Sequence, residues 1–258
     1  MVQSVQRAAR ILRELATHGP RLGVTELADR IGVSKPTVHA LLQTLEAEGL
    51  VRQEKGTSKY LLGMALLRLG NSYLETQELR SHSVAWADTL AERTGEAVWV
   101  AVLDDRHILV VHHAFRPRSG VQIPDLGASV PWNTSALGKS LAAFLPSQRQ
   151  QELLEGDLAR LTGHSVVDPV VLADQLEAVR QTGYALEDQE STLGEACIAS
   201  PVFDRSGEPA GAIGVIGPVE RLLSKANRQR HAIAVRDVAT LLSRELGAGR
   251  GVAWRVTD

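Results

Sequence analysis

Hydrophobic positions in residues 34–49 repeat with the period of an amphipathic helix. The apolar side chains at i, i+3, i+4 and i+7 are Val38, Leu41, Leu42 and Leu45. This spacing predicts one buried helical stripe, with Ser34 as N-cap, Pro36 in the first turn and Gly49 as the C-terminal stop. The opposite face is polar, which leaves two interpretations open: an ordinary surface helix, or a helix that reads base edges in DNA.

Two further helices are predicted before this segment. They span residues 4–19 and 23–32, and Thr25 is the expected cap of the second. The expected inward side chains are Val5, Ala9, Leu12, Leu15, Leu27, Ala28 and Ile31. A turn at Gly32 joins the second helix to residues 34–49, so this pair has the helix-turn-helix pattern, in which the later helix enters the major groove.

A hairpin is predicted directly after the third helix. Residues 50–63 contain two short apolar runs around the turn Lys55-Gly56-Thr57-Ser58. Together with the three helices it indicates a winged helix-turn-helix. The net charge of the whole chain is −2, whereas residues 1–60 hold nine Lys and Arg against six Asp and Glu, a net of +3. This asymmetry favours one polyanion-binding part, which we expect to act as two or more copies.

Several stretches resemble the IclR-type bacterial transcription regulators. The winged helix-turn-helix of that family is similar to SVQRAARILRELA, GVTELADRIGVSKPTVHALLQTLEAEGLV and KYLLGMALLRLG. Its second half is similar to VPWNTSALGKSLAAFLP and GYALEDQESTLGEACIASPVFDRSGEPAGAIGVIGPVERL. The resemblance covers roughly residues 3–246. Within the family, the stretches SVQRAARIL, LGNSYLE and LGEACIASPVFDRSG look closest to the glycerol-operon regulators of actinobacteria.

The expected fold class is α+β, in four parts. These are a winged helix-turn-helix in residues 1–62, a linker helix in 63–80, a second domain in 81–247 and a loose tail in 248–258. The resemblance implies that the second domain is a GAF-like effector-binding domain and that dimers form along the linker. An alternative for residues 63–80 is simply the last helix of the first domain.

Apolar patterning also predicts the elements of the second domain. The first are a helix over residues 81–95, a hairpin around Asp104-Asp105-Arg106, a strand at 120–124 and a helix from Thr134 or Ser135 to Ala143. A helix opened by Asp168-Pro169, two strands around Asp204-Arg205-Ser206-Gly207 and a final long helix over 224–247 follow.

The predicted DNA contacts lie on the polar face of the third helix and on the wing. We expect base contacts from Thr37, His39 and Gln43, of which Gln43 is the best founded because Gln pairs with adenine through two hydrogen bonds. The remaining candidates, mainly phosphate contacts, are Ser34, Lys35, Thr44, Arg52, Lys55 and Lys59. Ala40 departs from the family, where an arginine is frequent.

An effector pocket is expected around the start of the helix at Ser135. Free N–H groups there favour an anion or a carboxylate oxygen, although simple capping needs only one of the polar side chains. The resemblance implies a pocket lined by Trp132, Ser135, Ala136, Leu137, Glu187, Asp188, Cys197, Gly214 and Ile216. The alternative for Glu187 and Asp188 is a solvated turn, and for Trp132 a core aromatic.

Departures from the family bear on the effector. Many relatives carry small hydroxyl residues where this chain has Gly214 and Ile216, and Leu-His where it has Trp132-Asn133. We therefore expect an effector other than the simplest keto acids, and glycerol or a related polyol is suggested by the subgroup.

Composition and motifs narrow the class of function. The chain has 258 residues, 44% of them hydrophobic, and one cysteine. No apolar signal core, membrane-length run, phosphate loop or HExxH motif is found, so we expect a cytoplasmic protein with no catalytic site, metal or cofactor. The expected partners are double-stranded operator DNA, a small organic effector and further copies of the chain, as a dimer or a dimer of dimers. The alternatives are an activator and a metal- or redox-responsive sensor, whose ligands would be Cys197, His112, His113 and His231.

Overall fold

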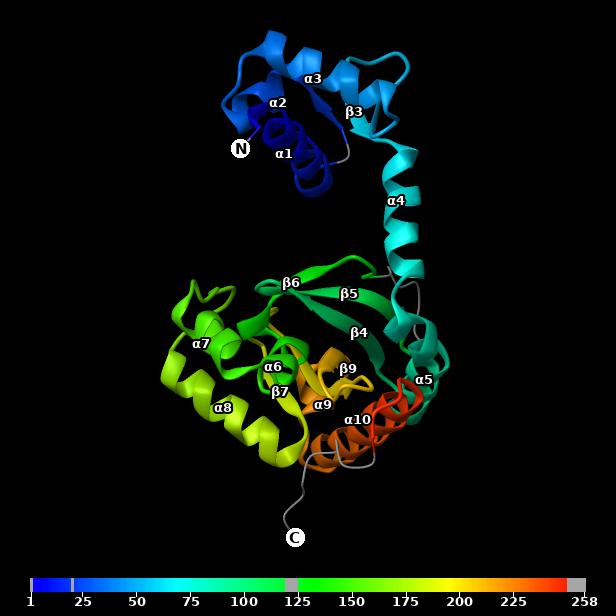
Figure 1. Ribbon diagram of the computed structural model, residues 1–258, viewed down its shortest axis with the longest axis vertical. Coiled ribbons are helices and arrows are strands. Elements are labelled where there is room, and N and C mark those ends of the chain that lie inside the picture. The colour runs from blue at the N-terminus through cyan, green and yellow to red at the C-terminus, as the bar shows by residue number, and fades with distance from the viewer. Residues whose placement is uncertain (1, 20, 119–124, 250–258) are drawn as a thin grey trace. The chain divides into compact units, whose positions relative to one another are not determined.

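The computed structural model describes residues 2–19, 21–118 and 125–249 (Figure 1). The chain separates into two compact units, residues 1–76 and 77–258. No helix in the described ranges is long and apolar enough to cross a membrane.

The first unit contains four helices and a small sheet among its described residues. Its helices are α1 (Gln3–Thr17), α2 (Val24–Ile31), α3 (Lys35–Ala47) and α4 (Met64–Glu75), and its strands are β1 (Leu22–Gly23), β2 (Val51–Gln53) and β3 (Lys59–Leu62). The strands are antiparallel in the order β1-β3-β2. The predicted helices and hairpin are confirmed, whereas β1 was not predicted because a two-residue strand has no alternation to detect.

The core of the first unit corrects two local predictions. Ile11 and Leu15 are the buried residues of α1, and Val5 is 67% exposed, so Val5 was wrongly placed on the inward face. Thr25 was wrongly chosen as a cap: the N-cap of α2 is Gly23, whose N–H donates to Oε2 of Glu26 at 2.7 Å. The predicted inward residues of α2 and α3 are buried, except Leu41, which is half-buried.

The second unit is built on one antiparallel sheet with the strand order β6-β5-β4-β9-β8-β7. The strands are β4 (Ala97–Asp104), β5 (His107–Ala114), β6 (Ser129–Pro131), β7 (Ala185–Asp188), β8 (Glu195–Phe203) and β9 (Pro209–Pro218). The helices are α5 (Glu78–Thr94), the 3-10 turn η1 (Trp132–Thr134), α6 (Ala136–Ala142), α7 (Ser147–Glu155), α8 (Pro169–Thr182), α9 (Val219–Leu222) and α10 (Lys225–Glu245).

Helices cover both faces of this sheet. Figure 1 shows α6, α7 and α8 on one side and α5 and α10 on the other. On the α6 side a buried apolar cluster joins Trp132, Leu137 and Leu176 to residues of β4, β8 and β9. The expected α+β class is therefore confirmed.

Most predicted elements of the second unit are present. The two hairpins and the final helix are confirmed, and Oδ1 of Asp168 caps α8 by accepting from Val170 N–H at 2.8 Å. The linker prediction needs correction, because α4 ends at Glu75 and a separate helix begins at Glu78, three residues before the predicted position. The strand expected at 120–124 and most of the tail (250–258) lie outside the described residues.

Candidate functional site

The outward face of α3 presents a continuous polar stripe. Lys35, His39 and Gln43 stand at i, i+4 and i+8 and are all exposed, so their side chains lie above one another on the helix surface. Thr44 is exposed beside this stripe, and its hydroxyl donates to the carbonyl of Ala40 at 3.2 Å. The inward residues Val38 and Leu42 are fully buried, which holds the stripe facing away from the core.

The start of α3 differs from the prediction in one hydrogen bond. Ser34 is the N-cap, but its hydroxyl makes no capping bond. Instead the Oγ of Ser34 and the Oγ1 of Thr37 lie 2.9 Å apart. Thr37 is half-buried, so its hydroxyl is less available to DNA than the exposed side chains along the stripe.

The wing carries three exposed cations. Arg52 lies in β2, Lys59 in β3 and Lys55 in the turn between them, and all three are exposed. The carboxylate of Glu46 in α3 accepts from the N–H of Gln53 at 2.9 Å. This hydrogen bond connects β2 to α3, so it holds the cations of the wing in place relative to the polar stripe of α3.

The expected effector residues around α6 are buried. Asn133 and Thr134 use their side chains internally: the Asn133 amide donates to the carbonyls of Ala159 and Val166, and Thr134 Oγ1 donates to Pro131. Ser135 is the N-cap of α6 without a side-chain capping bond. Trp132, Ala136 and Leu137 belong to the buried apolar cluster, although the indole N–H of Trp132 has no acceptor among the described residues.

Glu187 and Asp188 lie in β7, so the alternative of a solvated turn is wrong. Successive strand residues point to opposite faces, and here Glu187 is 1% exposed whereas Asp188 is exposed. Oε1 of Glu187 accepts from the N–H groups of Glu190 and Ser191 at 2.6 and 3.1 Å. Burial raises the pKa of Glu187 to about 7 despite these bonds.

The raised pKa makes stability depend on pH. In the folded chain Glu187 keeps its proton up to about pH 7, whereas the unfolded residue loses it near its ordinary value of 4.5. The folded state therefore binds more protons in this window, and the free energy of unfolding falls as pH rises from about 4.5 to 7. We expect Glu187→Gln to flatten this part of the stability curve, as measured by urea unfolding at several pH values. A wild-type slope retained in the variant would contradict the assignment.

Cys197, Gly214 and Ile216 meet on the same face of the sheet as Glu187. Cys197 pairs in register with Glu187 on one side and Ile216 on the other. Burial raises the pKa of the Cys197 thiol well above its ordinary value, which disfavours the thiolate that redox or metal chemistry needs. A methyl group on Gly214 would lie 2.8 Å from Cβ of Ala199, so the packing leaves no room for a hydroxyl side chain here.

A cavity of about 460 Å³ lies beside these residues at the β4–β5–β9 side of the sheet. Its lining residues are Glu96, Ala97, Trp99, His113, Arg116, Asp125, Thr192, Glu195, Ile216, Gly217 and Pro218. Ile216 is the member of the predicted effector set found there. A cavity of this size suits a small organic ligand.

Two ring nitrogens at this cavity are buried without a partner among the described residues. They are Nε1 of Trp99 and Nε2 of His113, two residues that pair in register between β4 and β5. Nδ1 of His113 accepts the N–H of Asp125 at 2.9 Å, and burial lowers the pKa of His113. The neutral ring then carries its proton on Nε2, so the cavity has two unused N–H donors.

Trp99, Asp125 and Glu195 were not predicted from the sequence, and His113 was predicted only as a possible ligand of a metal- or redox-responsive sensor. The alternation within β4 could have indicated Trp99, but the register that brings it beside His113 is set by long-range pairing. Burial, and then the nearby Asp125, raise the pKa of Glu195. Within the described ranges no three His, Cys, Asp or Glu side chains converge as a metal site, so the metal-sensor alternative gains no support.

Comparisons with known proteins match both units to one family. The model of the IclR helix-turn-helix domain matches residues 4–55, and that of the bacterial transcriptional regulator IclR C-terminal region matches residues 71–244. The chain is similar to the glycerol operon regulatory proteins of Streptomyces griseus and Streptomyces coelicolor, with 44% and 42% identity over 96% of this chain and 98% of each relative. It is also similar to the crystal structure of the IclR transcriptional regulator from Alicyclobacillus acidocaldarius, with a TM-score of 0.81 and 27% identity over 96% of this chain and 100% of the other.

Proposed function

The chain belongs to the IclR family of bacterial transcriptional regulators, and we propose that it represses a catabolic operon until a small organic metabolite binds its second unit. The observation that carries the DNA-binding role is the exposed stripe Lys35–His39–Gln43 beside the cationic wing. Regulators of this family bind operator DNA, are not enzymes and respond to small effectors. Since its target is DNA, we place the protein in the cytoplasm.

Gln43 is the proposed reader of one base pair. A Gln side chain can donate to N7 and accept from N6 of adenine, and a good pair of this kind discriminates by about 1–3 kcal/mol. We expect Gln43→Ala to lose most of the preference at one position of each half-site while changing binding to unrelated DNA little. Competition binding with single-base operator variants measures this effect, with Gln148→Ala, at an exposed glutamine of α7, as a matched control. An unchanged base preference in Gln43→Ala would remove Gln43 from the reader set.

Two copies of the chain are proposed to act together. Large apolar side chains are exposed on α1 and α4, namely Val5, Met64, Leu67, Leu69 and Tyr73. Exposed apolar residues at helical spacing favour a protein partner, and a two-fold dimer would match two half-sites about one helical turn apart. Segment 63–80 is the proposed linker through which effector binding changes the spacing of the two reading units.

The proposed effector is a polyol or a related compound. This follows from the similarity to glycerol operon regulatory proteins and from the two unused N–H donors at the cavity near Ile216. Of the residues predicted to line the effector pocket, we retain those on this face of the sheet and those at the start of α6. They are Glu187, Cys197, Gly214 and Ile216 on the sheet, and Trp132, Ser135, Ala136 and Leu137 at α6. Asp188 drops out because its side chain lies on the opposite face.

The test is to titrate candidate effectors into the preformed protein–DNA complex and follow fluorescence anisotropy. A coupling of about 1–3 kcal/mol would weaken DNA binding several-fold to a hundredfold. We expect glycerol or glycerol phosphate to release the DNA. If neither compound releases the DNA but another metabolite does, the protein is still an effector-controlled regulator, and the proposal of a polyol effector is wrong. If effector binding tightens DNA binding, the protein is an activator or a corepressed repressor.

A further inference from the structure

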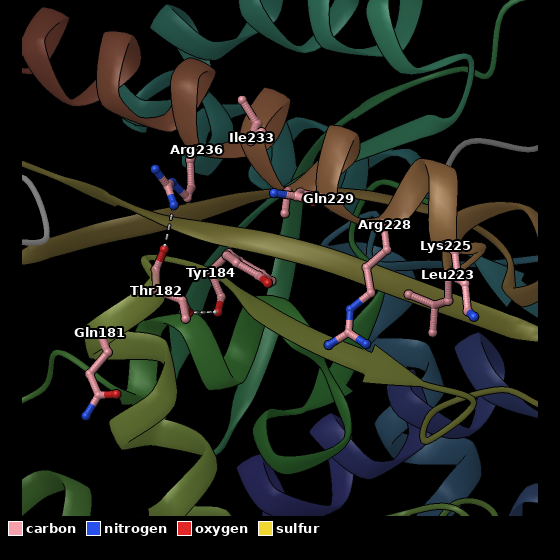
Figure 2. Close-up of a pocket in the computed structure, with 10 residues that line it drawn as sticks. Gln181, Thr182, Tyr184, Leu223, Lys225, Arg228, Gln229, Ile233 and Arg236 are labelled. Carbon is pink, nitrogen blue, oxygen red and sulfur yellow. Dashed lines mark hydrogen bonds between the residues drawn. The ribbon is translucent and has the colours of Figure 1, made fainter. Parts of the chain in front are cut away.

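A second cavity lies in the same unit, between the end of α8 and α10, and its lining residues are not among those assigned to DNA or effector. It has a volume of about 640 Å³ and is drawn in Figure 2. Thr182, Tyr184 and Arg228 also line a neighbouring cavity of about 260 Å³. Cavities of this combined size hold small organic ligands.

The cavity wall is cationic. One face of α10 supplies Lys225, Arg228 and Arg236, and the lining residues include no Asp or Glu. Within the described chain, Lys225 and Arg228 make no ion pair and both are exposed. The cations thus line a cavity to which none of the lining residues contributes a negative charge.

Two arginines near the cavity differ from the cations that line it, because each of them is paired with a carboxylate. Arg180, two residues before the end of α8, pairs with Glu177, and Arg221, in α9, pairs with Glu96. Both arginines flanking the cavity are therefore neutralised by carboxylates, whereas those inside it are not. Cations held together without partners raise the local positive potential and favour an anionic ligand.

Arg236 is held in place by one hydrogen bond, and a second N–H group of its guanidinium has no acceptor among the residues that the structure describes. Its Nη1 donates to the carbonyl of Thr182 at 3.0 Å, as the dashed line in Figure 2 shows. Its Nε is buried and has no partner in the described chain. A buried guanidinium N–H without an acceptor costs free energy, and an oxygen of a bound anion would satisfy it.

The rest of the wall suits the organic part of such a ligand. Along α10, Ala232 and Ile233 lie on the same face as the cations, at i+7 and i+8 from Lys225. Across the cavity stands Tyr184, whose ring and hydroxyl both face it in Figure 2. Arg and Lys together bind phosphate oxygens well, Arg by its planar fork and Lys as a point charge.

We propose that the cavity between α8 and α10 is a second ligand site, which binds a small phosphate monoester through Lys225, Arg228 and Arg236. The site is separate from the cavity at Ile216, and it does not depend on the DNA-binding role. It would let the regulator respond to a phosphorylated metabolite in addition to its effector.

Isothermal titration of the full-length protein in a low-salt, phosphate-free buffer tests this site. The probes are inorganic phosphate, glycerol phosphate and unphosphorylated glycerol, and the variants are Arg228→Gln and Lys225→Gln/Arg228→Gln. Arg244→Gln is the matched control, because Arg244 is an exposed residue of α10 that does not line the cavity. Thermal unfolding verifies that each variant is folded.

We expect one saturable glycerol phosphate binding step in wild type and in Arg244→Gln that is at least about tenfold weaker in Arg228→Gln and absent from the double variant, whereas any binding at the cavity near Ile216 is equal in all variants. Glycerol should not compete. Phosphate binding as strong as that of the ester would mean that the anion alone is recognised, and the ester assignment would be overturned. Equal binding in all variants, or no saturable binding to wild type, would overturn the site itself. Weaker DNA binding in the double variant without any anion would assign the cavity to nucleic acid instead.

Discussion

Replacing Arg52, Lys55 and Lys59 together by alanine is expected to weaken operator binding on the order of a hundredfold at moderate salt. The three side chains are exposed on the wing, and Glu46 holds β2 against the reader helix. Each phosphate contact releases counterions, so log Kd depends on log salt with a slope of about 0.9 per contact. Two copies would lose about six contacts, and the slope should fall by about five units. Anisotropy titrations at several salt concentrations measure both quantities.

The control variant also loses three positive charges, but from the second unit instead of the wing. Arg205, Arg230 and Arg244 are exposed and lie outside the wing, so their triple alanine variant tests net charge alone. We expect it to bind operator within about twofold to threefold of wild type, since these three residues are not among the proposed phosphate contacts, and only contacted phosphates release counterions. Equal losses in the two triple variants would show that the wing makes no phosphate contacts.

Lys139→Met is expected to destabilise the second unit by about 3–5 kcal/mol. The ammonium group is 1% exposed, and it donates to both oxygens of the Glu190 carboxylate at 2.6 and 2.8 Å. Burial lowers the pKa of Lys139, and the attraction of Glu190 opposes this. Without Lys139 the carboxylate of the buried Glu190 would keep, among the described residues, only a long bond from the N–H of Val166, at 3.4 Å. Urea unfolding measures the loss.

A double variant shows whether the loss of stability comes from the broken Lys139–Glu190 ion pair or from altered packing. Lys139→Met/Glu190→Gln removes both charges, so no uncompensated carboxylate remains, and most of the lost stability should return. If the double variant were less stable than Lys139→Met, the ion pair would not be the cause. An unchanged stability in Lys139→Met would show that the pair contributes little in solution.

Local patterns predicted most of the elements. The stripe of α3, the hairpin around Gly56 and the Asp168 cap of α8 each depend on residues close in sequence, and the structure confirms them. Errors fall where tertiary packing decides between equally apolar faces: Val5 is exposed and Ile11 is buried in the same helix. Helix period alone cannot tell which neighbouring stripe the other helices will cover.

The site was harder to predict because it depends on the register of distant strands. Trp99 and His113 come together only through the β4–β5 pairing, and the Lys139–Glu190 pair joins α6 to the end of β7, 51 residues apart. The residues near α6 and on β7–β9 came from the family resemblance and not from periodicity. The cationic face of α10 was overlooked because spacing shows that Lys225, Arg228 and Arg236 share a face but not that they border a cavity.

The central claim is that two copies of α3 and the wing read operator DNA. Hydroxyl-radical footprinting of DNA from upstream of this gene and its neighbours tests it most directly, with wild type beside the triple variant at Arg52, Lys55 and Lys59. We expect two protected half-sites about one turn of 10–10.5 base pairs apart, which the triple variant leaves unprotected at the same concentration. A uniform footprint with no half-sites, or no protection of any fragment with or without candidate effectors, would contradict it.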